Sequence, residues 1–184
     1  STGVIGQPLP LEPIEGSIGE LAGALSPENH ADFASAIMTT DTVMKEVAVE
    51  FTLGGKTCRI GGICKGSGMI MPNMATMLCF LTTDAAISPD LLRLALKRVV
   101  DDTFNMVSVD GDTSTNDTVL LLASGDAGNA EIVRQDADSS RFANALYVVL
   151  MNLSRMIAAD GEGATKLLEC TVSGAESREQ AAVV

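Results

Sequence analysis

The junction between Ala75 and Thr76 has the residue types that an intramolecular acyl transfer needs. Thr76 begins a continuous apolar segment, residues 76–83, which predicts a fully buried strand. A loop with two glycines and a proline precedes it, and such a loop can hold the Ala75 carbonyl beside the Thr76 hydroxyl. Attack by that hydroxyl turns the peptide bond into an ester, and water then releases the upstream chain.

Cleavage at this junction would free the α-amino group of Thr76. An α-amine has an ordinary pKa of about 8, so it can serve as general base for the hydroxyl of the same residue. One residue then supplies both nucleophile and base, as in N-terminal-nucleophile enzymes, and no histidine is required. The chain contains one histidine, His30, which we expect to be structural or at the surface of an early helix.

Composition narrows the class of protein. The chain has 184 residues, 3% aromatic residues and no tryptophan, so Leu, Val, Ile, Ala and Met must fill the core. The formal net charge is −12, and no Lys/Arg cluster reverses that field locally, which argues against nucleic acid as a partner. The sequence has no apolar stretch near the roughly 20 residues that span a bilayer, so we predict no membrane segment.

The cysteines and acidic residues give little support for a metal site. The four cysteines lack the C-x-x-C spacing, and we expect buried, reduced thiols in a cytoplasmic protein. Alternating oxygen-bearing side chains in residues 110–117 resemble a calcium loop, but Leu121 stands where an EF-hand needs a bidentate acid. We expect this loop to cap backbone groups through Asx-type hydrogen bonds instead.

The coarse pattern predicts helices packed on a mixed sheet, a fold of the α/β or layered α+β class. Helices are expected to start at Ser26 and Ser88, and a long one to cover residues 140–159. Strands are expected at residues 47–53, 57–64, 76–83, 118–123 and 164–172, with the first two joined in a hairpin at Gly54-Gly55.

A longer sequence motif around Thr76 strengthens the hypothesis that Thr76 is a nucleophile. Residues 65–78, KGSGMIMPNMATML, resemble almost residue for residue the self-cleavage segment of the ornithine acetyltransferase (glutamate N-acetyltransferase) family. Residues 38–42 (MTTDT), 108–118 (SVDGDTSTNDT) and 160–166 (DGEGATK) are similar to that family too, in the same order. The resemblance implies an N-terminal-nucleophile-like architecture and spans nearly all of the chain.

The resemblance also implies residue roles. Thr76 would be the nucleophile, with cleavage between Ala75 and Thr76 giving residues 1–75 and 76–184. Thr2 and Gly3 match the family's oxyanion turn, where fixed donors are typically worth about 3–4 kcal/mol each. The residues that match substrate contacts are Thr42, Lys65, Thr76 and Glu162.

The activity implied by the resemblance is transfer of an acetyl group from N-acetylornithine to glutamate in arginine biosynthesis. It needs no cofactor, although acetyl-CoA is an alternative acetyl donor that would make the enzyme an amino-acid N-acetyltransferase as well. Association of the cleaved halves into a homo-oligomer is expected.

Two other interpretations stay open. A peptidase or amidase of related fold would use water in place of glutamate. Both ends of the chain look cut from a longer one, so an inactive fragment that serves only in assembly is the second alternative. In each case a single compact unit of residues 1–184 is expected.

Overall fold

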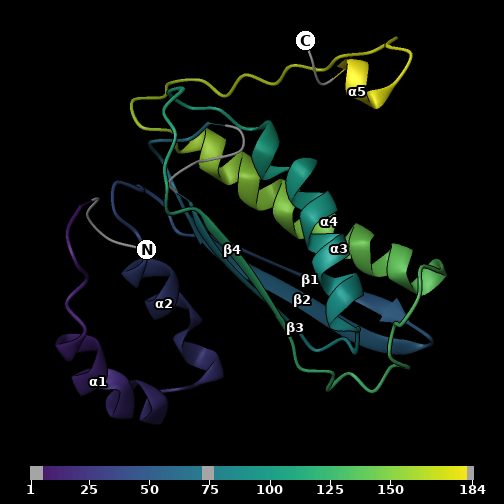
Figure 1. Ribbon diagram of the computed structural model, residues 1–184, viewed down its shortest axis with the longest axis horizontal. Helices are drawn as coiled ribbons and strands as arrows, with labels where there is room; N and C mark the ends of the chain where they lie inside the picture. The colour runs from purple at the N-terminus through teal and green to yellow at the C-terminus, as the bar shows by residue number, and fades with distance from the viewer. Residues whose placement is uncertain (1–5, 72–76, 182–184) are drawn as a thin grey trace.

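A four-stranded mixed sheet organises the chain. The computed structural model describes residues 6–71 and 77–181, and Figure 1 shows two helices, α3 and α4, layered on one face of the sheet. The strands follow one another in the order β1-β2-β3-β4. The pairs β1/β2 and β2/β3 are antiparallel, and β3/β4 is parallel. The predicted α+β layering on a mixed sheet is thus confirmed.

The first two strands form the predicted hairpin. β1 (Lys45–Leu53) and β2 (Lys56–Lys65) are joined by Gly54 and Gly55, both at positive φ, which glycine adopts without strain. Alternate residues of β1 and β2 are buried, so this ribbon turns one side toward the helices. In this register Lys45 pairs with Cys64, at the end of the hairpin away from the turn.

The parallel pair needs a crossover, and α3 provides it. β3 (Leu78–Thr83) leads through α3 (Pro89–Asp101) and the short 3-10 helix η2 (Phe104–Met106) to β4 (Thr118–Ala123). The register pairs Leu78 with Thr118, so β3 and β4 start side by side. The loop before β4 therefore lies next to the segment that enters β3.

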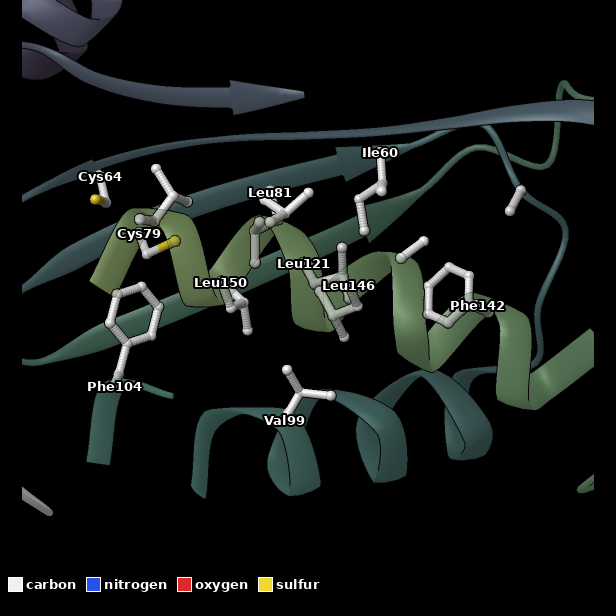
Figure 2. Packing of buried hydrophobic residues seen from close by; sticks show 14 of the residues in the cluster. Ile60, Cys64, Cys79, Leu81, Val99, Phe104, Leu121, Phe142, Leu146 and Leu150 are labelled. Atoms are coloured by element: carbon white, nitrogen blue, oxygen red, sulfur yellow. The ribbon is translucent and has the colours of Figure 1, made fainter. Parts of the chain in front are cut away.

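The long helix α4 (Ala137–Ala159) supplies much of the core. It starts three residues earlier than predicted, because Asp136 and Ser139 form a reciprocal capping box. Among the described helices it is the one long and apolar enough to cross a membrane, but one face of it packs in the core. Figure 2 shows this packing, with Phe142, Leu146 and Leu150 of the helix labelled. Val149, Leu153 and Ile157 of the same helix also belong to the buried cluster.

The N-terminal helices lie apart from this layer. The predicted helix after Ser26 is confirmed in a divided form: Ser26 caps the 3-10 turn η1 (Pro27–Asn29), and α2 (His30–Ala36) follows. Phe33 of α2 reaches Phe80 of β3, with ring centroids 5.3 Å apart. The sequence patterns did not predict α1 (Glu12–Gly23), which has no buried residue.

The predicted strand at residues 164–172 is wrong. This segment has no strand assignment, and its side chains are exposed, with Leu168 at 90% exposure. Alternating residues favour an extended chain, but a strand also needs a partner, and the described sheet ends at β1 and β4. Cys170 lies here and is exposed, contrary to the expectation of buried thiols. The chain then enters a short helix, α5 (Arg178–Ala181).

The contact between β2 and α4 gives a test of the packing. A Cβ atom on Gly62 would lie 2.5 Å from Leu81 Cδ2 and 3.1 Å from Leu153 Cδ1. Gly62→Ala should therefore overpack the core and lower the free energy of unfolding by about 1–3 kcal/mol.

The matched control is Gly61→Ala. Its new Cβ would be no closer than 3.5 Å to a neighbouring atom, the Cβ of Ala48. We expect this variant to unfold within about 0.5 kcal/mol of the parent in urea titrations. Equal losses in both variants would contradict the packing described here.

Candidate active site

Three of the predicted site residues lie in the described structure, on three different segments. Thr42 precedes β1, Lys65 ends β2, and Glu162 follows α4. The other predicted residues, Thr2, Gly3, Ala75 and Thr76, lie outside the described residues, and so does the cleavage junction.

Thr42 is bound to the end of α4. Its backbone N–H donates to both carboxylate oxygens of Asp160, at 3.0 and 3.3 Å, and its hydroxyl donates to the same carboxylate. These residues are 118 positions apart in the chain. Thr42 itself is exposed, so a carboxylate fixes its backbone while the residue stays open to a ligand.

Lys65 is a nearly buried lysine at the end of a central strand. The residue is 6% exposed, and no ion pair recorded within residues 6–71 and 77–181 includes it. Gly66, the next residue, donates its backbone N–H to Asp41 over 2.7 Å. An ammonium placed in this way is suited to a carboxylate supplied by a ligand.

Glu162 is joined to the loop that follows Lys65. Its backbone N–H donates to the Ser67 carbonyl over 2.6 Å, and its carboxylate occupies the space that a Cβ on Gly68 would need. Glycine at position 68 thus permits the close approach. Ser67 also shares a 2.6 Å hydrogen bond between hydroxyl groups with Thr40, so the three segments are tied together.

A buried ion cluster lies behind these bonds. The Lys45 ammonium is 2.7 Å from the Asp41 carboxylate and 2.5 Å from that of Asp160. The side chains of Lys45 and Asp41 are fully buried, and that of Asp160 is 6% exposed. The sequence analysis did not single out this cluster. The sequence feature that could have indicated the cluster is Lys45, since the alternation of buried and exposed residues in β1 places this lysine on the side that faces the core.

Both carboxylates of the cluster have a lowered pKa. Burial opposes ionisation of Asp41, but the Gly66 N–H and the Lys45 ammonium offset it, so the pKa of Asp41 lies below its ordinary value. Burial likewise opposes ionisation of Asp160, and hydrogen bonds from Lys45 and Thr42 lower its pKa overall. Both groups therefore stay charged at neutral pH.

The 110–117 loop caps backbone groups, as predicted. Asp110 accepts hydrogen bonds from the backbone N–H groups of Met69 and Ile70, at 2.7 and 3.1 Å. Burial opposes ionisation of Asp110, but the N–H groups of Asp112, in an Asx turn, and of Met69 and Ile70 lower its pKa overall. Asp117 accepts from the Met77 N–H over 2.8 Å.

These two carboxylates hold the chain on either side of the predicted cleavage segment. Met69 adopts a positive φ of 53°, which a non-glycine residue rarely does, and Asp110 binds its N–H. On the other side the Thr118 N–H donates to the Met77 carbonyl over 3.0 Å. Ile70 and Met77 also line a pocket of about 120 Å³, together with Phe104 and others.

The thiols and the histidine take no part in this site. Burial raises the pKa of Cys64 to about 12 and that of Cys79 well above its ordinary value, so both stay unreactive thiols. His30 is half-exposed and contacts Glu46, in line with the surface role predicted for it. Among residues 6–71 and 77–181 there is no cluster of three or more metal-ligating side chains.

The ion cluster predicts a pH dependence of folding stability. Carboxylates whose pKa is lowered by folding contribute stability above their unfolded pKa, and that stability is lost as the pH falls through the folded pKa. Asp160→Asn removes one such group. We therefore expect the parent to lose more stability than this variant on acidification below about pH 4, measured by urea unfolding at several pH values.

A matched control is Asp138→Asn, because Asp138 forms an exposed ion pair with Arg141 at the same 2.7 Å distance as the Lys45–Asp41 contact. Its pH profile should follow that of the parent. A profile for Asp160→Asn that also follows the parent would contradict a lowered pKa at Asp160.

Comparison with known proteins places this arrangement in a family. The model of the ArgJ family matches residues 1–184. Arginine biosynthesis bifunctional protein ArgJ of Symbiobacterium thermophilum is 56% identical over 181 residues, which cover 98% of this chain and 45% of the relative. ArgJ 1 of Clostridium acetobutylicum is 54% identical over 184 residues, again 45% of its length.

The chain thus spans a little under half the length of these relatives. A crystal structure of arginine biosynthesis bifunctional protein ArgJ from Bacillus halodurans is 47% identical, with a TM-score of 0.46 over 47% of this chain and 41% of that one. The family match over the whole sequence and the high identity to curated relatives agree with the motifs in residues 38–42, 65–78, 108–118 and 160–166. This chain belongs to the ArgJ family.

Proposed function

We propose that this chain carries the nucleophile and part of the substrate site of a glutamate N-acetyltransferase of arginine biosynthesis. The observation that carries the proposal is the joining of Thr42, Lys65 and Glu162, from three distant segments, by hydrogen bonds through Asp160, Asp41 and Ser67. Membership of the ArgJ family, whose relatives are named for arginine biosynthesis, supports the same activity.

The proposed reaction exchanges an acetyl group between two amines. The Thr76 hydroxyl attacks the acetyl carbonyl of N-acetylornithine, its proton passes to the Thr76 α-amine, and the tetrahedral oxyanion is stabilised by Thr2 and Gly3. Collapse breaks the amide C–N bond, the proton moves to the departing nitrogen, and ornithine leaves. The amine of glutamate then attacks the acetyl ester, giving N-acetylglutamate and restoring the hydroxyl.

The described residues have complementary roles in this proposal. Lys65 offers an ammonium to the α-carboxylate that both substrates share. Glu162 offers a carboxylate to a substrate amine or to the Thr76 ammonium. Thr42 is an exposed residue whose hydroxyl donates to Asp160. The chemistry requires no cofactor, with acetyl-CoA as an alternative donor of the acetyl group.

The proposal includes association of the cleaved halves with each other and with further copies, in a cytoplasmic homo-oligomer. The exposed apolar residues support it. α1 presents Ile14, Ile18 and Leu21 at 46–63% exposure, and β4 presents Leu120 and Leu122. Apolar surface of this kind is expected where other protein covers it.

Self-cleavage is tested first, by intact mass under denaturing conditions. The parent should give two species, residues 1–75 and 76–184, and the second should gain one acetyl group after brief exposure to N-acetylornithine. Thr76→Ala should remain a single species of 19.1 kDa.

Thr82→Ala is the matched control, since Thr82 is an exposed threonine on β3, and this variant should cleave like the parent. A parent that stays whole after long incubation would contradict self-activation of this chain. Acetyl release to water without transfer to glutamate would instead favour the peptidase or amidase interpretation.

The role of Lys65 is tested by Lys65→Met. Loss of a charge-assisted contact of about 1.5–3 kcal/mol should raise the KM for N-acetylornithine about 10- to 100-fold, with kcat little changed if the contact is equally strong in the transition state. Lys56→Met, at the exposed opposite end of β2, should leave KM unaltered. An unchanged KM in Lys65→Met would overturn this role.

A further inference from the structure

The carboxylates of the buried ion cluster also accept hydrogen bonds from the segments that carry the candidate substrate residues. Besides Lys45, the hydrogen-bond donors recorded for Asp41 are the backbone N–H groups of Thr39 and Gly66, and the donor recorded for Asp160 is Thr42. Each of these donors lies in, or next to, a segment that carries a candidate substrate residue. One ammonium therefore fixes two carboxylates, which in turn fix two site segments.

We infer that Asp41, Lys45 and Asp160 form a positioning triad, which sets the spacing of Thr42, Lys65 and Glu162 for the substrate. The inference rests on the proposed function and goes beyond it, because these three residues need not touch the substrate. The triad places Thr42 through Asp160 and the Lys65–Gly66 end of β2 through Asp41. It places Glu162 through Asp160, which lies two residues earlier in the chain.

A second, uncharged link supports the same assignment. The Ser67 hydroxyl is 2.6 Å from that of Thr40, and the Ser67 carbonyl accepts from the Glu162 N–H. Ser67 is 1% exposed, so solvent does not compete for these bonds. The 39–42, 65–67 and 160–162 segments thus meet at two independent links, and removal of one link should loosen the site without unfolding the chain.

The geometry of a substrate site tolerates little movement. A displacement of about 1 Å can cost about a hundredfold in rate or binding. The triad has the properties that a rigid support needs: buried side chains, short distances and satisfied charges. If one carboxylate were neutralised, the segments that carry Thr42, Lys65 and Glu162 would no longer be held in fixed positions relative to one another.

The test is Asp160→Asn in the full chain, with steady-state kinetics and direct binding of N-acetylornithine. Asparagine keeps the size of the side chain but removes its negative charge. Its one oxygen acceptor replaces the two carboxylate oxygens that now serve the Lys45 ammonium and Thr42. We expect KM for both substrates, and the dissociation constant of N-acetylornithine, to rise about tenfold. The change in kcat should be smaller. Self-cleavage should persist, because Met69 and Met77, on either side of the predicted cleavage segment, are held separately by Asp110 and Asp117.

Two further variants keep the test decisive if Asp160→Asn folds poorly. Ser67→Ala removes the hydroxyl bond to Thr40 and keeps the backbone bond to Glu162, so it should raise KM by only about threefold, with a similar rise in the dissociation constant. Asp138→Asn, which breaks the exposed ion pair with Arg141, should leave both constants at the parent values.

The outcomes separate this inference from the proposed function. A parent that transfers acetyl groups, with unchanged KM in both Asp160→Asn and Ser67→Ala, overturns the positioning triad alone. An equal rise in KM for Asp138→Asn also overturns it, since the effect would then follow from general loss of stability. A parent that neither binds N-acetylornithine nor transfers its acetyl group overturns the proposed function and the triad with it.

Discussion

A buried ammonium needs anionic partners, and Lys45 is 1% exposed. Moving a lysine side chain out of water costs several kcal/mol unless carboxylates surround it, and removal of one partner from such a group typically costs about 3–5 kcal/mol. Asp41 and Asp160 supply the carboxylates from before β1 and from the end of α4. The start of β1 and the last turn of α4 must therefore meet at one place, and the rest of the site is built from there.

The parallel pairing of β3 and β4 provides the second constraint. Because Leu78 lies opposite Thr118, the acidic loop that ends at Asp117 is brought beside Met77, where β3 begins. Asp110, at the other end of that loop, binds Met69 and Ile70. A single loop thus holds both sides of the predicted cleavage segment, and the sheet register accounts for the contact at Met77.

Local sequence patterns predicted most of the fold. The glycines at 54 and 55 predicted the hairpin, and alternation predicted the strands that pair within it. Residues 164–172 show the same kind of signal without a neighbouring strand, and pattern alone cannot reveal that. The residue types of the site were found through the family motifs, but the contact between Lys45 and Asp160 spans 115 positions, and no local pattern predicts it.

The two buried lysines among the described residues, Lys45 and Lys65, differ in their ion pairing. Lys45 is paired with two carboxylates, whereas the described ion pairs leave Lys65 out. In a chain of net charge −12, acidic side chains are abundant, so exclusion of Lys65 from pairing requires that nearby carboxylates be occupied elsewhere. Asp41 meets that need, since it accepts from Gly66, beside Lys65, while bound to Lys45. Among the described residues, the cluster thereby leaves Lys65 outside the ion pairs, as the proposed contact with a substrate carboxylate requires.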